Sequence, residues 1–353
     1  MKPRAVVREA WRNTVSGSAR SLTLALSLGV LVMLLAAADN GAVAHLLRQA
    51  ADYRSKGASV TILIAEGLVD GHRCDRLADL PGVRAAGAIR ATSDRITGTV
   101  LPTAPIPVSE STAGFLEIVR EAPRASGVLL GPDAADAFGI DAADEIVTAS
   151  GTTPVAGTYD YPDDGRRRGL SYAAIAPTAD SASFDECWVD AWPQDDGIVA
   201  ALLTTARPAT EDRAKPEIAQ LNSTLGRSFD GAAAFASRPT RFAAGAAAAG
   251  GLALGLLGVR LRRLQLASAL HAGVSRRGLL AISVLEACGW VALCGAVVVP
   301  GTVIAAHALG GSAESYTLGW GVFVAGAAGA FAGTCAGVAT THERHLFRYF
   351  KAR

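Results

Sequence analysis

The sequence has 353 residues, of which 50% are hydrophobic and 18% charged, and its formal net charge is +1. This length leaves room for more than one domain, and the net charge is informative only when it is divided by region. Residues 39–240 hold 28 acidic and 18 basic residues, a net charge of −10, whereas the other basic residues flank apolar segments. A large acidic block argues against nucleic acid as a partner.

The N-terminal residues 1–20 predict a basic amphipathic helix on the inner face of a membrane. Val6, Val7 and Trp11 alternate with arginines, and an indole ring is well suited to the headgroup region. The alternative is the basic start of a signal peptide, because an apolar run follows and Ala36–Ala38 resembles a cleavage site. Three later apolar segments favour a retained anchor.

Four apolar segments have about the length of a membrane helix, which needs roughly 20 residues. We expect membrane helices at 21–38, 241–259, 279–308 and 319–340. The large hydrophilic block, 39–240, lies between the first and the second of them. The helix of the first segment is expected to continue beyond the membrane as a stalk.

The block 39–240 predicts an α+β domain with stalk helices. Residues 57–65 are rich in β-branched side chains, and residues 127–161 predict a strand, a helix that ends at Gly139, and two short strands. Residues 208–237 predict mainly helix, leading back to the membrane. The expected class is therefore a four-helix membrane protein with an α+β domain inserted between its first and second helices.

Five cysteines divide by region, and Cys74 and Cys187 are the two in the hydrophilic block. In an extracytoplasmic domain they could form a disulfide. The other interpretation is two separate buried thiols, since the sequence gives no distance between them.

The segment 260–278 is a basic loop between the second and third membrane segments. It holds five arginines and no acidic residue, and positive charge collects on cytoplasmic loops. Its middle, Leu264–Leu270, predicts a short helix that ends at Gly273. The tail 341–353 is also basic, whereas the link 309–318 has no Lys or Arg, so both termini and this loop are expected on the cytoplasmic side.

Two features inside the apolar segments have alternative interpretations. Gly329, Gly333 and Gly337 recur every four residues, which favours close helix packing in a bundle or a dimer interface, unless the glycines reflect composition alone. Glu286 lies about two turns inside the third segment, where a charge normally faces protein or water. It is either a functional carboxylate or a structural one paired with a basic residue of the loop.

Several signatures of catalysis are missing from the sequence. It has neither a G-x-x-x-x-G-K-[ST] phosphate loop nor a G-x-S-x-G nucleophile motif. The H-E-R-H at 342–345 places its histidines too close together for zinc ligation on one helix face. We therefore expect no catalytic residue, cofactor site or metal site, and a chain that is not itself an enzyme.

The order of these segments resembles the permeases of MacB/FtsX-type ABC transporters. The resemblance in segment order covers nearly the whole chain, and the similar stretches within it are residues 9–32, 79–89, 128–159 and 262–287. Gln265 stands where the family commonly has Glu, and His271–Val274 replaces an Ala-Leu-Gly-Ala run while keeping Gly273.

The resemblance implies a mechanism in which two permease chains work with two separate ATPase subunits that hold ATP and Mg. The coupling contacts it implies are Gln265, Leu266, Ala269, Leu270 and Gly273. The chain would lie in the bacterial cytoplasmic membrane and expel a peptide, lipid-linked or amphipathic substrate by mechanotransmission. A homodimer is expected, with a heterodimer as the alternative. A second function remains open, a transmembrane regulator that activates a cell-wall hydrolase or relays a signal.

Overall fold

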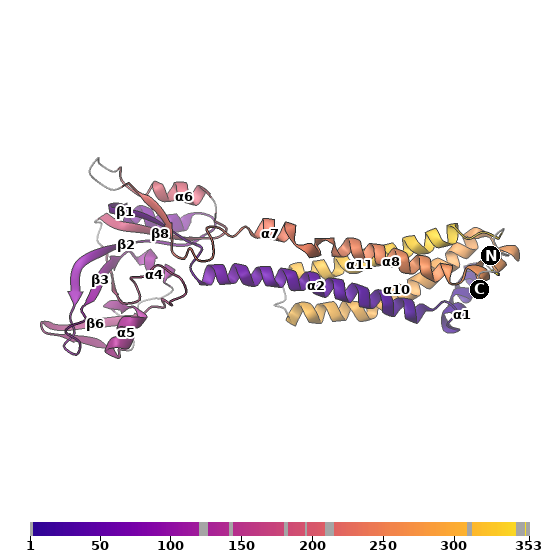
Figure 1. Ribbon diagram of the computed structural model, residues 1–353, viewed down its shortest axis with the longest axis horizontal. Helices are drawn as coiled ribbons and strands as arrows, with labels where there is room; N and C mark the ends of the chain where they lie inside the picture. Colours follow the sequence, from indigo (N-terminus) through magenta and orange to yellow (C-terminus); the bar gives the residue numbers. More distant parts are fainter. Residues whose placement is uncertain are drawn as a thin grey trace. The chain divides into compact units, whose positions relative to one another are not determined.

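The computed structural model describes residues 3–119, 126–140, 144–179, 183–194, 196–208, 215–308, 313–343 and 350. The chain divides into two compact units (Figure 1), one formed by Met1–Arg48 and Gly231–Arg353 and the other by Gln49–Asp230. The first unit is helical and the second is built on a sheet.

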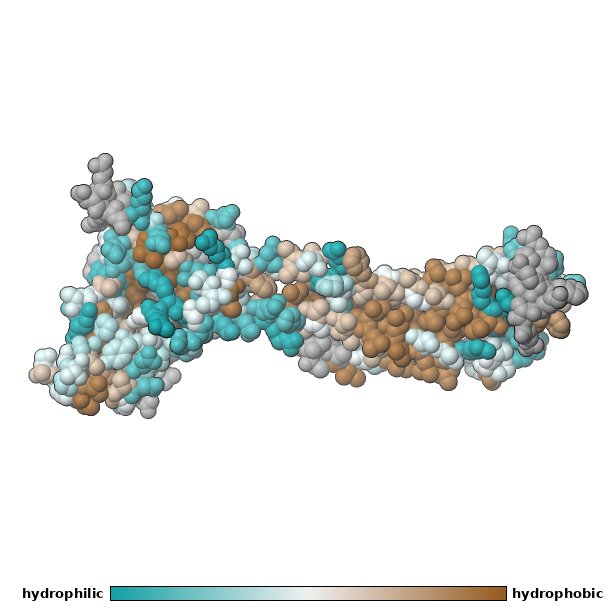
Figure 2. Space-filling view, in the orientation of Figure 1, coloured by the Kyte–Doolittle hydropathy of each residue, from teal (hydrophilic) through white to brown (hydrophobic). Residues whose placement is uncertain are grey.

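Among the residues that the structure describes, four helices are long and apolar enough to cross a membrane. These segments are Ser21–Ser55, Pro239–Arg260, Arg276–Ile304 and Tyr316–Ala339, which confirms the prediction of four apolar helices of membrane length. Figure 2 shows a largely hydrophobic surface over the helical unit and a mainly hydrophilic one over the sheet unit. The helices described are α1 Pro3–Val15, α2 Ser21–Ser55, α7 Gly231–Ser237, α8 Ala243–Arg260, α9 Arg263–His271, α10 Arg276–Ala308 and α11 Ala313–Ala339.

Helices α8 and α11 touch through their backbones because glycines face the contact. A Cβ added to Gly329 would lie 2.0 Å from the carbonyl oxygen of Ala248, and one added to Gly333 would lie 2.0 Å from that of Leu252. At Gly337 the added atom would meet the Val259 side chain at 2.7 Å. The glycine stripe therefore packs within the chain, as one interpretation of the sequence expected, and these glycines are not available as a dimer interface.

In its described residues the sheet unit has nine strands, in the order β5-β6-β4-β7-β3-β2-β8-β1-β9. The neighbours β3 and β7, and β4 and β6, are parallel, whereas the other pairs are antiparallel, so the sheet is mixed. The strands are β1 Val60–Asp70, β2 Val83–Ile96, β3 Ile106–Ser111, β4 Val128–Leu130, β5 Glu145–Thr148, β6 Gly151–Thr158, β7 Ala174–Pro177, β8 Ser183–Ala191 and β9 Glu217–Gln220.

Short helices complete the sheet unit. They are α3 Gly71–Asp75, α4 Ala113–Ile118, α5 Pro132–Phe138 and α6 Asp196–Leu203, with a 3-10 turn at Arg76–Asp79. Helix α5 ends at Gly139, whose φ of 63° is the left-handed conformation that favours glycine, and this confirms the predicted helix end.

The prediction of mainly helix over 208–237 is wrong for most of the described part of that segment. Residues Glu217–Gln220 form strand β9, which pairs antiparallel with β1, and a helix forms only at Gly231–Ser237. Residues 209–214 lie outside the described part. Strand pairing with β1 supplies backbone hydrogen bonds that local helix propensity does not take into account.

A disulfide joins Cys74 of α3 to Cys187 of β8, with Cα atoms 5.8 Å apart and a sequence separation of 113. Both residues are fully buried in one apolar core of the sheet unit. Of the two interpretations of these cysteines, the structure therefore contains the bridged one.

The last turns of α2 are fixed within the sheet unit by Tyr53. Its hydroxyl donates to the Gln194 side chain at 3.0 Å and accepts from the Gln220 amide at 2.8 Å. Its ring lies beside those of Trp192 and Phe229, with centroids 6.0 and 5.8 Å away. Helix α2 is continuous from Ser21 to Ser55, so the helix that contains the first apolar segment also supplies the first residues of the sheet unit.

Candidate functional site

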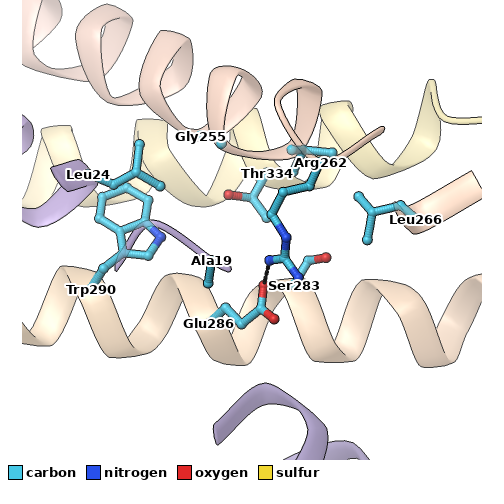
Figure 3. A pocket seen from close by; sticks show the side chains of 11 residues that line it. Ala19, Leu24, Gly255, Arg262, Leu266, Ser283, Glu286, Trp290 and Thr334 are labelled. Carbon is cyan, nitrogen blue, oxygen red and sulfur yellow. Dashed lines mark hydrogen bonds and ion pairs between the residues drawn. The ribbon is translucent and has the colours of Figure 1, made fainter. Parts of the chain in front are cut away.

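The candidate site is a buried polar network around Glu286 of α10. Arg262 donates from Nη1 to Glu286 Oε2 at 2.5 Å, and the two side chains are 11% and 7% exposed. Asn13 of α1 donates from Nδ2 to Glu286 Oε1 at 2.7 Å. Both carboxylate oxygens therefore have partners, and Figure 3 shows the Arg262 guanidinium pointing at the carboxylate.

Each member of the network is positioned by a different element. Arg262 is the residue before α9, and its amide donates to the carbonyl of Val259 at the end of α8. Asn13 lies in the last turn of α1, which packs Val6 and Ala10 against Ile282 of α10. One carboxylate thereby connects α1, the α8–α9 junction and α10.

The space beside this network is too small for a substrate. The cavity has a volume of about 20 Å³, which is room for a water molecule or two, and Leu24, Trp290 and Thr334 are among its lining residues. Truncating one member of a buried ion pair leaves an uncompensated charge, so the pair holds its elements together. Of the two interpretations of Glu286, the structure favours the structural carboxylate paired with a loop arginine.

Helix α9 ends at the turn that the sequence predicts. Gly273 has a φ of 91°, its amide donates to Leu270 at 3.0 Å, and the Val274 amide donates to Ala269 at 3.0 Å. This pair of bonds satisfies carbonyls that the helix end would leave free, and glycine permits the left-handed turn. Ser275 then accepts a hydrogen bond from the Gly278 amide at the start of α10.

The five residues predicted to contact an ATPase do not share one surface. Leu266 is buried in a small apolar cluster with Val259, Leu279 and Val338, and Ala269 and Leu270 are half-buried against it. Gln265 and Gly273 are exposed. Leu266 therefore attaches α9 to the helical unit and is not itself a contact surface.

Sequence reasoning missed two exposed residues of the same segment, Ser268 and Ala272. With Gln265 they form one face, at spacings of three and four residues. The apolar periodicity indicated only that α9 has an apolar side. The burial of that side by the same chain appears only in the structure.

A second candidate is a groove of about 490 Å³ in the sheet unit. Ile64, Ile89 and Leu170 are apolar residues of its lining, and Glu186 is one of its charged residues. Glu186 accepts from Arg167 at 2.8 Å and from the Trp188 indole at 2.7 Å. Each carboxylate oxygen of Glu186 therefore has a hydrogen-bond partner, and the two bonds fix the orientation of the carboxylate.

Tyr161 also lines the groove. It donates its hydroxyl to the Arg167 carbonyl at 2.5 Å. Burial raises the pKa of Tyr161 to about 12, although Arg166 and Arg167 act in the opposite direction. The phenol is therefore neutral and structural at physiological pH. Among the residues that the structure describes, no three His, Cys, Asp or Glu side chains gather as a metal site requires.

Comparison with known proteins gives little beyond a distant likeness. No protein-family model and no curated protein matches the sequence. Among solved structures, the chain is similar to the periplasmic region of MacB from Actinobacillus actinomycetemcomitans, with 9% identity and a TM-score of 0.32 over 42% of this chain and 82% of that one. At this similarity the match carries no functional argument.

Proposed function

We propose that this chain is the permease subunit of an ABC-type transporter in a bacterial cytoplasmic membrane, and that a separate ATPase docks on α9. The supporting observation is that α9 exposes one face while its other side is attached to the helical unit through Leu266. The arginines of 260–278 support a cytoplasmic position for this face, where an ATPase has access to ATP.

Force on α9 would reach two other elements through the buried network. Arg262, at the start of α9, pairs with Glu286 of α10, and Glu286 binds Asn13 of α1. Breaking a buried ion pair is costly, so a displacement of the α8–α9 junction favours movement of α10 and α1 with it.

The α2 helix supports transmission to the sheet unit, which we propose is extracytoplasmic. Its apolar segment and its terminal Tyr53 belong to one continuous helix, and Tyr53 is held by Gln194 and Gln220. In this proposal two permease chains and two ATPases cycle together, with ATP and Mg bound by the partner. The outer units then expel a peptide, lipid-linked or amphipathic molecule, and the permease itself catalyses no reaction.

The test enlarges a side chain on the exposed face of α9. Ser268→Trp, in the full chain purified with its native partners, should lower the ATPase activity recovered per permease by about tenfold, because overpacking a contact costs roughly 1–3 kcal/mol. Ser16→Trp is the matched control, since Ser16 is also exposed in the helical unit but lies outside α9. Equal ATPase recovery from the wild type and the Ser268→Trp variant would contradict docking on α9.

The same preparation also distinguishes a transporter from a transmembrane regulator. A regulator of a cell-wall hydrolase would retain the hydrolase through its sheet unit and lack an expelled molecule. A transporter would retain or release a substrate whose export stops when ATP hydrolysis stops. Measuring export of the copurified ligand from reconstituted vesicles distinguishes the two functions.

A further inference from the structure

A groove of about 410 Å³ runs between α1 and the first turns of α10. Its lining is apolar along Val6, Val7, Ala281 and Leu285, with Pro3 at the start of α1. Ser275, Arg277 and Gly278 supply the polar part of the lining. The groove therefore combines a hydrophobic channel with a single permanent positive charge.

The groove exists because α1 presents only part of its apolar surface to α10. Val6 and Ala10 are buried against Ile282, which together with the Asn13–Glu286 hydrogen bond holds α1 in place. Val7, Trp11 and Val15 are 58%, 70% and 68% exposed and recur every four residues. This exposed stripe continues the apolar wall of the groove along α1.

The charges around the groove favour an anion. Among the residues that the structure describes, no acidic side chain lines it, and Glu9 of α1 is paired with Arg12 at 2.7 Å. Arg277 is exposed and makes no ion pair with the residues that the structure describes. A guanidinium binds phosphate oxygens through two parallel hydrogen bonds, so Arg277 is suited to a phosphate group.

The location of the groove favours a lipid headgroup as the source of that phosphate. The membrane-length segment of α10 begins at Arg276, so Arg277 lies in its first turn and Ala281 and Leu285 follow inside it. In the proposed membrane topology the charge lies at the membrane surface, and the apolar channel lies toward the hydrocarbon. Basic pockets between helices at a membrane surface bind anionic headgroups.

We propose that this groove is a binding site for one anionic phospholipid. The phosphate lies at Arg277, and an acyl chain lies along Val7, Ala281 and Leu285. A lipid whose headgroup carries a positive charge would place that charge near Arg277 and be repelled by it. An anionic lipid such as phosphatidylglycerol has no such positive charge. The site is independent of the proposed ATPase docking, because it needs no residue of α9.

The experiment places the full chain in nanodiscs and measures lipid retention by native mass spectrometry. The wild type should retain one phosphatidylglycerol and unfold at a higher temperature in phosphatidylglycerol discs than in phosphatidylcholine discs, since a ligand that binds the native state stabilises it. Arg277→Gln should lower retention by about fivefold, the effect of one arginine at an anionic surface. Arg276→Gln is the matched control, because Arg276 is the neighbour of Arg277 on the same helix turn but does not line the groove.

A second pair of variants tests the acyl-chain part. Ala281→Trp fills the channel and should abolish lipid retention. Leu280→Trp, one residue away and outside the groove, should leave retention unchanged. Both positions are exposed, so the variants are expected to fold. Equal losses from Arg276→Gln and Arg277→Gln would indicate a diffuse charge effect and overturn the proposal. It would equally be overturned if Ala281→Trp left retention unchanged, or if inorganic phosphate alone reproduced the thermal shift.

Discussion

Two arginines bracket α8 with buried ion pairs. Arg238, before the helix, pairs with Asp39 of α2 at 2.9 Å, and the two side chains are 10% and 4% exposed. Arg262, after the helix, pairs with Glu286 of α10. Each pair joins α8 to a different neighbour. A buried pair is costly to break on one side because the remaining charge loses its partner, so these residues fix where α8 lies within the helical unit.

Removing the charge of Glu286 tests this role. Glu286→Gln keeps a hydrogen-bonding side chain but leaves Arg262 buried without a counter-charge, so the full chain should lose about 3 kcal/mol of stability. The double variant with Arg262→Met should recover most of that loss, because no buried charge remains. The measurement is the free energy of unfolding in detergent, compared through a double-mutant cycle.

Arg260→Met is the control for that cycle. Arg260 belongs to the same basic region but is exposed, and its substitution should change stability by less than about 0.5 kcal/mol. Additive effects of the Arg262 and Glu286 substitutions would contradict the coupling.

At the scale of elements, the backbones of α8 and α11 approach each other closely enough that added Cβ atoms would clash on both helices. Added Cβ atoms on Gly251 and Gly255 of α8 would lie 2.1 and 2.2 Å from carbonyl oxygens of α11, and those on Gly329 and Gly333 would meet carbonyls of α8 at 2.0 Å. Such a backbone contact requires glycine on both sides. In lipid, where there is no hydrophobic drive between helices, this close approach supplies the packing energy.

The glycine stripe gives opposite expectations for two alanine substitutions in α11. Gly329→Ala should destabilise the chain by about 1–3 kcal/mol, because the methyl group has no room. Gly321→Ala meets nothing within 4 Å and should be neutral or stabilising by up to about 1 kcal/mol, since alanine favours the helix. Thermal unfolding of the two variants in the same detergent makes the comparison. A Gly329→Ala variant as stable as Gly321→Ala would show that the helices separate easily.

At the scale of the whole molecule, the Cys74–Cys187 bridge reports on the compartment of the sheet unit. A disulfide closing a loop of this length typically contributes about 2–5 kcal/mol, and it persists where the environment is oxidising. The five cysteines divide cleanly, because Cys288, Cys294 and Cys335 are free thiols of the helical unit. The number of reactive cysteines in the native chain therefore tests the proposed extracytoplasmic position of the sheet unit.

Cells quenched in acid and then denatured should yield a chain with three cysteines open to a polyethylene-glycol maleimide. Treatment with a reductant before labelling should raise the number to five. The Cys74→Ser/Cys187→Ser double variant should show three under both conditions. Five labelled cysteines without reductant would place the sheet unit in a reducing compartment and contradict the proposed topology.

The sequence alone determined those features of this protein that depend only on residues close together in the chain. Runs of apolar residues predicted four membrane-length helices, because the bilayer sets their length and composition. Gly139 and Gly273 correctly predicted where two helices end, because a left-handed turn depends on one residue and its nearest neighbours. The four-residue spacing of the glycines predicted close packing for the same local reason.

Only the tertiary structure decided what these elements contact. It decided that the glycine stripe faces α8 within the chain, that Glu286 pairs with Arg262 and Asn13, and that Leu266 faces inward while Ser268 faces outward. Residues 217–220 form a strand because they pair with β1 in the tertiary structure. Each of these contacts is between residues far apart in the chain. The periodicity of a sequence predicts the face of the helix on which an apolar or charged side chain lies, but it does not predict which residue that side chain contacts.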